Sequence, residues 1–357
     1  MHCWEFHYII SLIPATGEIS QYNMTSATDY KELFKSFSSI KIGVIGDMML
    51  DTYWWGNVER ISPEAPVPVV TVDRKEYRIG GAGNVALNLA SLGTPVSVFS
   101  VLGKDDDGQI LRGLLDEKKI ETGYLLNADN RITTNKMRVI SRNQQMMRLD
   151  SETMLPLTTD QEQKLIASVD RFIREQSPAA IIFEDYNKGV LTEKVICDVI
   201  DMCKHHSVIT AADPKRKHFF EYKGVDIFKP NLKEAREALN LLIEEVNNDT
   251  LIHIHRNLKA QLNHRISLIT LSEKGVFYED GQDSHIVPSH IRNVADVSGA
   301  GDTVIAVATL IYTLTKNTAM MAEIANLAGG LVCEAVGTVA IEKARLLKAC
   351  QRLLVNK

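Results

Sequence analysis

The chain has 357 residues, which is enough for one large domain or two small ones with a substantial core. Its 40 Lys and Arg against 45 Asp and Glu give a net charge of −5, without a basic block or an acidic tail. Five scattered cysteines without a C-x-x-C pair fit reduced thiols, and no apolar run reaches transmembrane length. We therefore expect a cytoplasmic protein without a nucleic-acid or membrane partner.

The chain divides into an N-terminal extension and one folded domain. Residues 1–38 show no clear periodicity and predict an irregular extension, followed by a domain over 39–350. Strands are predicted over 40–45, 96–101, 179–183, 208–212, 225–228 and 266–270. Helices are predicted over 83–92, 107–118, 161–175, 192–205 and 232–240. This alternation predicts an α/β fold with a central, mostly parallel sheet flanked by helices.

Polar side chains follow several predicted strands at the point where each strand ends. They are Asp47, Glu184, Asp185, Asp213, Asn231 and Thr270. Because parallel strands place their carboxyl ends at one edge of a sheet, where ligands bind in such folds, we expect these side chains to line one site.

Two segments break the alternation of strands and helices. Residues 66–77 predict an extended edge strand. In residues 133–149 the side-chain character alternates from one residue to the next over a long stretch, a pattern that a crossover helix would not have. Both are typical of antiparallel strands, and they predict a small β-lid over about 53–79 and 132–149. Because one lid face is rich in Met and Val, we expect a homodimer that forms through the lid.

A run of small residues precedes a strongly apolar helical segment near the C-terminus. Gly299, Ala300 and Gly301 allow a ligand to approach the backbone, and unpaired N–H groups at a helix start bind anions. Asp302 then lies in the first turn, as an ionised base beside a bound phosphate. This pairing suits transfer of a phosphoryl group to a hydroxyl. The alternative is an ordinary Gly-rich turn.

A second glycine cluster spans residues 80–86. It is neither G-x-G-x-x-G nor a P-loop, so it supports neither a dinucleotide fold nor a Walker site. Its glycines, Gly81 among them, allow close approach of a ligand, and Asn84 can both donate and accept hydrogen bonds. A turn that only packs a helix is the alternative interpretation.

These two clusters resemble the signatures of the pfkB, or ribokinase-like, carbohydrate kinases. Residues 80–86 with Gly93 and Gly103 resemble the N-terminal signature, and residues 296–302 resemble the C-terminal one, although Val307 departs from a small-residue position. The resemblance covers about residues 40–345. It implies a ribokinase-like fold, Asp302 as the catalytic base, and 299–301 as the anion hole for the transferring phosphate.

The same resemblance implies ATP and Mg²⁺ as cofactors, and it identifies positions that would hold them. Asn231 and Glu234 match an N-x-x-E motif that organises Mg²⁺ and phosphates, largely through water. The nucleotide-binding positions are Thr270, Ser272 in place of a glycine, Gly275, and Asn326 near adenine. The carbonyl groups of Asp296 and Ser298 match ligands of a monovalent cation, K⁺.

A narrower resemblance is to the heptose 7-phosphate kinases within this family. Residues 46–56, 60–70, 142–145, 185–189 and 213–215 carry it. It implies transfer of the ATP γ-phosphoryl group to the anomeric O1 of D-glycero-D-manno-heptose 7-phosphate, in ADP-heptose synthesis for lipopolysaccharide. The substrate-binding candidates are Asp47, Asp51, Gly81 and Asn84 for the sugar, and Arg142 and Lys188 for the 7-phosphate, with Lys136, Arg138 and Lys215 as weaker ones.

Some members of this branch carry an additional adenylyltransferase unit. Its H-x-G-H motif is not formed by 205–206 or 253–255, so we expect the kinase-only form. Two other functions stay open. One is a kinase of the same fold acting on a ribose, fructose or hexose phosphate, and the other is a non-catalytic sugar-binding regulator.

Overall fold

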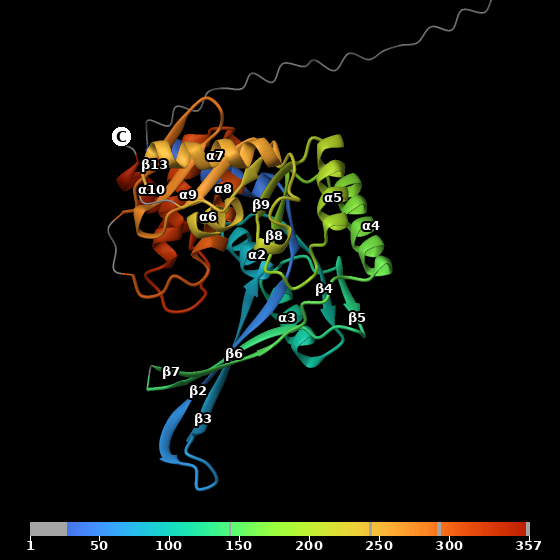
Figure 1. The fold of residues 1–357 in the computed structure, drawn as a ribbon, viewed down its shortest axis with the longest axis vertical. Coiled ribbons are helices and arrows are strands. Elements are labelled where there is room, and N and C mark those ends of the chain that lie inside the picture. Colours follow the sequence, from blue (N-terminus) through green and yellow to red (C-terminus); the bar gives the residue numbers. More distant parts are fainter. Residues whose placement is uncertain (1–26, 143, 243–244, 291–293, 355–357) are drawn as a thin grey trace, which may run out of the picture.

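A nine-stranded sheet forms the centre of the main body (Figure 1). The computed structural model describes residues 27–142, 144–242, 245–290 and 294–354, and within them the strand order is β13-β12-β11-β10-β9-β8-β1-β4-β5. The strands are β1 (Ile42–Gly46), β4 (Val96–Gly103), β5 (Leu125–Ala128), β8 (Ala180–Glu184), β9 (Ile209–Asp213), β10 (Ile227–Phe228), β11 (Ile266–Thr270), β12 (Val276–Glu279) and β13 (Ser284–Val287). From β5 to β11 the pairing is parallel, and β12 and β13 are antiparallel. The predicted α/β fold with a mostly parallel sheet is confirmed.

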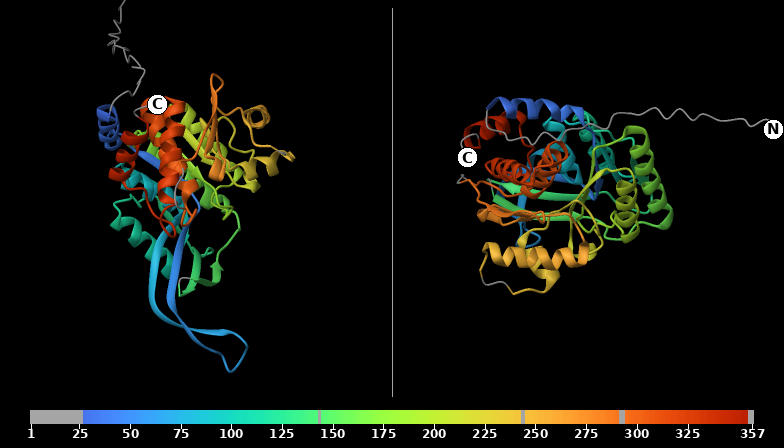
Figure 2. Two further views of the ribbon diagram at one scale, coloured as in Figure 1. Left: turned by 90° about the vertical axis from the view of Figure 1, so that its left-hand side faces the viewer. Right: turned by 90° about the horizontal axis from the view of Figure 1, so that it is seen from above.

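Helices cover both faces of this sheet (Figure 2). One core contains α1 (Ala27–Ser36), α2 (Ala82–Ser91), α3 (Asp106–Glu117), α8 (Ala300–Thr315), α9 (Thr318–Val332) and α10 (Lys343–Leu353). The other contains α4 (Thr159–Gln176), α5 (Glu193–His205), α6 (Leu232–Leu239) and α7 (Asn248–Leu262). Successive strand residues face opposite sides, so Val44 packs into the first core and Ile45 into the second. Within the described ranges, no helix combines the length and apolar character needed to cross a membrane.

The helix α1 corrects the prediction for the N-terminal segment. We expected an irregular extension over 1–38, but Ala27–Ser36 is helical and is followed by a short 3₁₀ turn. Leu33, Phe34 and Phe37 recur at helical spacing, are 6%, 1% and 0% exposed, and join the same core as α10. This short apolar stripe stabilises the helix through packing. The residues before Ala27 lie outside the described part of the chain.

A four-stranded sheet projects from one end of the main body (Figures 1 and 2). Its strands are β2 (Met48–Ile61), β3 (Pro68–Gly81), β6 (Thr134–Ser141) and β7 (Gln144–Ser151), in the order β3-β2-β6-β7. The expected antiparallel pairing holds within each hairpin, but β2 and β6 join the hairpins in parallel. Exposed apolar side chains lie on this lid, including Met147 and Leu149. The homodimer through the lid stays a prediction.

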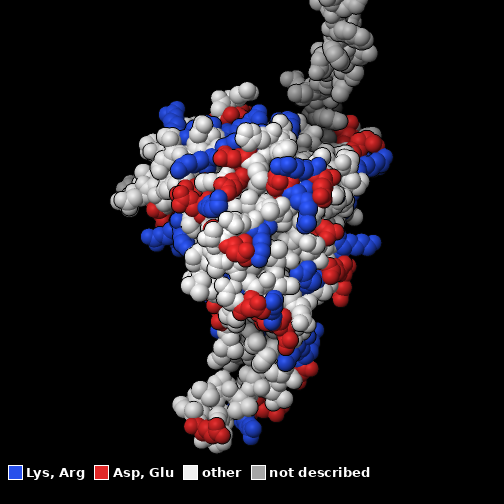
Figure 3. All heavy atoms as spheres, turned by 90° about the vertical axis from the view of Figure 1, so that its right-hand side faces the viewer, with Lys and Arg blue, Asp and Glu red and all other residues white. Residues whose placement is uncertain are grey.

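Charged side chains are spread over the surface without separation by sign. On the face shown in Figure 3, Lys and Arg stand among Asp and Glu. Many pair locally, as Lys164 does with Asp160 at 2.6 Å. Exposed pairs of this kind contribute little to stability, so the two buried cores carry the fold.

Candidate active site

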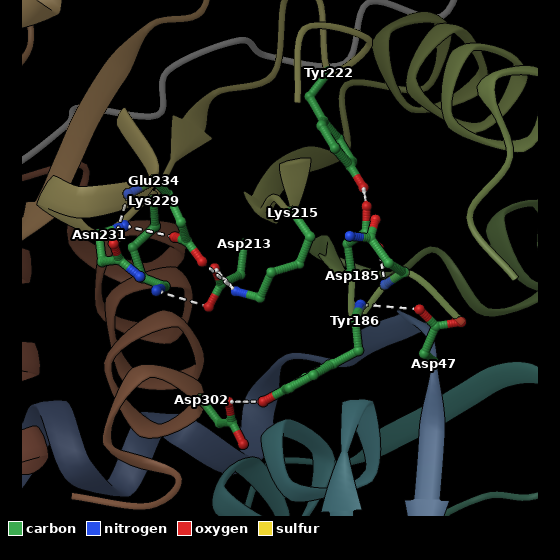
Figure 4. A network of polar contacts seen from close by, with 11 residues as sticks. Asp47, Asp185, Tyr186, Asp213, Lys215, Tyr222, Lys229, Asn231, Glu234 and Asp302 are labelled. Carbon is green, nitrogen blue, oxygen red and sulfur yellow. Dashed lines mark hydrogen bonds and ion pairs between the residues drawn. The ribbon is translucent and has the colours of Figure 1, made fainter. Parts of the chain in front are cut away.

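The site lies at the carboxyl edge of the large sheet, beside the start of α8. Figure 4 shows side chains from the ends of β8 and β9 and from the first turns of α6 and α8 converging on one region. This is the edge at which the polar residues after the strands were expected to meet. The parallel arrangement brings them together because every strand from β5 to β11 ends on this side.

Asp302 is buried and held from two sides. Asn84 donates from Nδ2 to Oδ2 of Asp302 at 2.7 Å, and the phenol of Tyr186 donates to Oδ1 at 2.8 Å. Burial raises the pKa of the Asp302 carboxyl, and the two hydrogen bonds act in the opposite direction. Burial and the charge of Asp302 also raise the pKa of Tyr186, so its phenol keeps the proton that it donates. A fixed carboxylate with a raised pKa is suited to accept a proton near neutral pH.

The start of α8 has the shape of an anion site. Gly299 is the N-cap with φ 77°, and a Cβ there would lie 2.7 Å from Nδ2 of Asn84. Glycine is therefore required both by the left-handed backbone and by the amide that holds Asp302. The amide of Ala300 donates to Val297 at 3.2 Å, so it is partly engaged in a turn. The Cα of Gly301 faces Lys229, because a Cβ built there would lie 3.6 Å from Nζ.

A chain of ion pairs connects the first turn of α6 to the start of α8. Lys229 lies 2.7 Å from Oδ2 of Asp213, and Lys215 lies 3.5 Å from Oδ1 of Asp213 and 2.7 Å from Glu234. Burial acts to raise the pKa of Asp213, but the two lysines together hold it below its usual value. Lys229 thus stands beside Gly301, and Asp213 lies between the two lysines (Figure 4).

Glu184 ends β8 within this group of charges. Its side chain is 0% exposed, and neither carboxylate oxygen has a hydrogen-bond partner among the described residues. Burial, followed by the charges of Asp213 and Asp302, raises the pKa of Glu184 well above its usual value. This carboxyl therefore differs from its neighbours, each of which has a partner.

Asn231 and Glu234 form a capping box at the start of α6. The side chain of Asn231 accepts from the amide of Glu234 at 2.8 Å, and Oε2 of Glu234 accepts from the amide of Asn231 at 2.8 Å. Since Oε1 of Glu234 also pairs with Lys215, both oxygens have partners. The motif thus has a structural role that the sequence reasoning missed, although S/T/D/N-x-x-E is a known cap signal. Its role in organising Mg²⁺ through water stays a prediction.

The predicted sugar ligands differ in their availability. Asp47 is 1% exposed, and its carboxylate accepts from the amides of Tyr186 and Lys188 at 2.9 Å and of Val190 at 3.1 Å. It therefore anchors the loop after β8, and its contact with the sugar stays a prediction. Asp51 is ion-paired with Arg138 at 2.6 Å on the lid.

Gly81 and Asn84 flank the start of α2. Gly81 caps that helix with φ 59°, and the amide of Ala82 donates to the carbonyl of Asp47 at 3.0 Å. Asn84 is fully buried beside Asp302. Of the predicted sugar ligands, Asn84 is the one with a direct contact to the predicted base.

Within the described residues, no hydrogen bond or ion pair joins the two predicted ligands of the 7-phosphate, Lys188 and Arg142, to each other or to a common residue. Lys188 is 8% exposed, and its Nζ lies 2.8 Å from Glu152. Arg142 is exposed at the turn between β6 and β7, with φ 47°, and this turn stands at the outer end of its hairpin (Figure 1). The grip on the 7-phosphate by these residues stays a prediction.

The predicted nucleotide-binding residues lie at the end of β11 and nearby. Thr270 ends the strand, Ser272 opens a 3₁₀ turn with φ 55°, and Gly275 follows with φ 98°. Ser272 thus adopts the left-handed backbone that favours the glycine it replaces. Asn326 donates to the carbonyl of Pro288 at 2.9 Å and so fixes the segment after β13.

Asp296 holds the loop in front of α8 through its side chain. Its Oδ1 accepts from the amide and hydroxyl of Ser298 at 2.9 and 2.8 Å, and its Oδ2 accepts from the amide of Gly337 at 2.8 Å. The predicted K⁺ site uses the carbonyl groups of Asp296 and Ser298, and it stays a prediction.

Two residues of this site were missed from the sequence. Tyr186 follows Asp185 in a stretch valued only for its resemblance, and Lys229 follows a two-residue strand, β10. The position of Lys229 directly after an apolar run is the one signal in the sequence by which it could have been found. Nothing local in the sequence pointed to the contact of Tyr186 with Asp302.

The fold and the site define a kinase that acts on carbohydrates. Residues 39–345 match the pfkB family carbohydrate kinases, and the chain therefore belongs to this family. It is 42% identical over 295 residues to the bifunctional protein HldE of Aliarcobacter butzleri, covering 83% of this chain and 61% of that protein. It is 39% identical over 321 residues to HldE of Geobacter metallireducens, covering 89% and 64%. The chain thus spans less than two thirds of the length of these relatives.

Solved structures show the same ribokinase-like fold. Phosphofructokinase-2 from Escherichia coli in complex with potassium gives a TM-score of 0.73 at 18% identity, covering 89% of this chain and 100% of that one. Ribokinase from Arabidopsis thaliana, complexed with ribose and ATP, gives 0.68 at 18% identity, covering 87% and 99%. At this level of identity, the likeness concerns the fold alone.

Proposed function

We propose that the chain transfers the γ-phosphoryl group of ATP to O1 of D-glycero-D-manno-heptose 7-phosphate and gives the 1,7-bisphosphate. The observation that carries this proposal is Asp302, buried at the start of α8 and fixed by Asn84 at 2.7 Å. A base beside an anion site is the arrangement that phosphoryl transfer to a hydroxyl requires. The stretches shared with heptose 7-phosphate kinases and the similarity to HldE proteins support this substrate.

The chemistry follows from the residues around Asp302. As the O1 oxygen attacks the γ-phosphorus, the bond from phosphorus to the ADP oxygen breaks, and Asp302 accepts the O1 proton. The amides at Gly299 and Gly301 stabilise the equatorial phosphate oxygens, together with Lys229 next to them. Such donors act without reorganisation, because the helix and the ion pair with Asp213 hold them in place.

The donor set of the site fits a hard cation, since carboxylates surround the unpartnered Glu184. When bound with ATP, Mg²⁺ neutralises negative charge on the phosphates. Asn231 and Glu234 would orient its water ligands from the start of α6. The capping box serves this role by fixing both side chains.

The remaining parts of the proposal concern the setting of the reaction. The reaction belongs to ADP-heptose synthesis for lipopolysaccharide and takes place in the cytoplasm. Thr270, Ser272, Gly275 and Asn326 would bind the nucleotide, and the carbonyl groups of Asp296 and Ser298 would hold a K⁺ ion. A homodimer forms through the exposed apolar side chains of the lid. The kinase activity belongs to the domain over residues 39–350.

An assay of ADP release against a panel of sugars tests the substrate. We expect release with heptose 7-phosphate, and ³¹P NMR should place the new phosphate on O1. Faster release with ribose, fructose 6-phosphate or a hexose phosphate would replace this substrate with that of another sugar kinase. No release with any sugar would favour a sugar-binding regulator.

A further inference from the structure

The carboxylate of Glu184 has no hydrogen-bonding partner in a region where the neighbouring charges are all paired. It is 0% exposed at the end of β8, and neither of its oxygens accepts a hydrogen bond from the described residues. A buried carboxyl without a partner is disfavoured in its ionised form. A bound cation would supply that partner and allow Glu184 to carry its charge.

Two other carboxylates face the same point. Glu184, Asp213 and Asp302 each offer one oxygen, and these three atoms lie within 4.8 Å of one another. Oxygen ligands of Mg²⁺ lie about 2.1 Å from the ion, so adjacent ligands are ~3.0 Å apart and opposite ones ~4.2 Å. The three oxygens would have to move inward from their present spacing to bind one ion together.

The nearby lysines do not balance the three carboxylates. Both lysines pair with Asp213 among the three carboxylates, Lys229 at 2.7 Å and Lys215 at 3.5 Å, and Lys215 also pairs with Glu234 at 2.7 Å. The hydrogen-bond donors of Asp302 are neutral, because they are an amide and a phenol. Glu184 thus has no cationic side chain in direct contact within the described structure.

We propose that Glu184, Asp213 and Asp302 bind one divalent cation, Mg²⁺ or Mn²⁺, directly through carboxylate oxygens, in the absence of nucleotide and sugar. Carboxylates are the ligands that these ions prefer. A carboxylate has about four lone-pair sites, so Asp302 can keep its hydrogen bonds to Asn84 and Tyr186 while one oxygen contacts the ion and the other the acceptor hydroxyl. The inference deepens the proposed kinase function, on which it rests only for the use of the ion in catalysis.

This cation site is distinct from the one expected at the start of α6. There, both oxygens of Glu234 have partners, and an ion would arrive with ATP and be held through water. The trio containing Glu184 instead lies beside the start of α8. An ion there would already be in place when the nucleotide brings its γ-phosphate to the start of α8.

The test measures Mn²⁺ binding to the full chain without nucleotide or sugar, by electron paramagnetic resonance of the free ion. We expect one bound Mn²⁺ per chain, and at least tenfold weaker binding for Glu184→Gln and for Asp213→Asn. Glu121→Gln is the matched control, because Glu121 is exposed at the opposite edge of the sheet. The control should bind Mn²⁺ as the unchanged chain does.

A second readout keeps the inference testable if one variant is altered in structure. Mn²⁺ should raise the Tm of the unchanged chain, because it binds only the folded state, and should not raise that of Glu184→Gln. Without Mn²⁺, Glu184→Gln should melt no lower, because the replaced carboxyl has no hydrogen-bond partner among the described residues. Unweakened Mn²⁺ binding by Glu184→Gln, or no bound Mn²⁺ in the unchanged chain, would overturn the inference. The kinase proposal is judged separately by ADP release.

Discussion

The phenol of Tyr186 donates a hydrogen bond of 2.8 Å to the carboxylate of Asp302, across 116 positions of sequence. Asn84 donates to the other oxygen at 2.7 Å. Burial raises the pKa of this carboxyl, and both donors act to lower it. The balance between these effects sets the pH at which the proposed base becomes ionised.

Replacement of Tyr186 by phenylalanine should raise the pKa of Asp302, because it removes one of the two hydrogen bonds that lower it. Tyr186→Phe removes one donor to the charged form, so the pKa of Asp302 rises and the acidic limb of the kcat profile moves to higher pH. We also expect kcat at pH 7 to fall by roughly tenfold, since a hydrogen bond to a charged group contributes about 1.5–3 kcal/mol. Initial rates of ADP release between pH 5 and 9 measure both effects.

Tyr222→Phe is the control for this change. The phenol of Tyr222 donates to Asp185 at 3.0 Å and makes no contact with Asp302. Tyr222→Phe likewise removes one tyrosine hydroxyl, but from a residue that donates to Asp185. It should leave the acidic limb of the kcat profile in place. If both variants shifted the limb equally, the effect would come from general disturbance of the loop after β8.

Asp302→Asn should separate catalysis from binding. The amide is isosteric but cannot accept the O1 proton, so we expect kcat to fall by about 10²–10⁴-fold. Affinities for ATP and sugar, measured by calorimetry, should stay within a few-fold. Asp170→Asn, which changes a carboxylate that pairs with Arg174 on the surface of α4, should leave kcat unaltered. Near-normal turnover by Asp302→Asn would remove the base from the mechanism.

The sequence was sufficient for the sheet and for most of the helices that cover it. Strands such as 179–183 are short, apolar and bounded by polar residues, and that pattern arises because both faces of β8 are buried. The helix α1 escaped prediction because its apolar stripe is short and gains stability only from the core that it shares with α10. The lid was predicted from about residue 53, whereas β2 already begins at Met48 with residues that are buried.

The site was predicted in part, and the misses have a common cause. Asp302 and Asn84 were predicted from two local motifs, and the structure places them in contact, while their roles stay predictions. Asp47 stays a predicted sugar ligand, but its hydrogen bonds to amides 139 to 143 positions away were not foreseen. Strand order decides which polar ends become neighbours, and no local pattern encodes that β8 lies between β1 and β9.

The capping box at α6 allows stability and nucleotide binding to be measured apart. Asn231→Ala should lower the free energy of unfolding by about 1 kcal/mol, because the amide of Glu234 loses its acceptor. It should also raise KM for MgATP if the proposed role at the phosphates is right. Urea unfolding and steady-state kinetics measure the two effects.

Asn247→Ala supplies the matched comparison for Asn231→Ala. Asn247 forms the same kind of capping box with Thr250 at the start of α7. Its loss should cost a similar free energy of unfolding and leave KM for MgATP unchanged. An unchanged KM in both variants would reduce Asn231 to a helix cap.

The buried imidazole of His264 should make stability depend on pH at a distance from the site. Burial lowers its pKa to about 3, and the charges of His255 and Lys259 add to this effect. The unfolded chain titrates near 6.5, so between pH 6.5 and 3 the unfolded state binds a proton that the folded state does not. Stability is therefore lost as pH falls through this window, by about 2 kcal/mol at pH 5 relative to pH 8.

His264→Gln tests this origin by urea unfolding at pH 8 and pH 5. The variant loses the contact of Nε2 with Ser267 at 2.6 Å, so we expect lower stability at pH 8. Its further loss between pH 8 and pH 5 should be about 2 kcal/mol smaller than in the unchanged chain. His253→Gln, on the exposed side of α7, should retain the full pH dependence. Because each variant is compared with itself at two pH values, the constant loss of packing cancels. An unaltered pH dependence in His264→Gln would assign the effect to other groups.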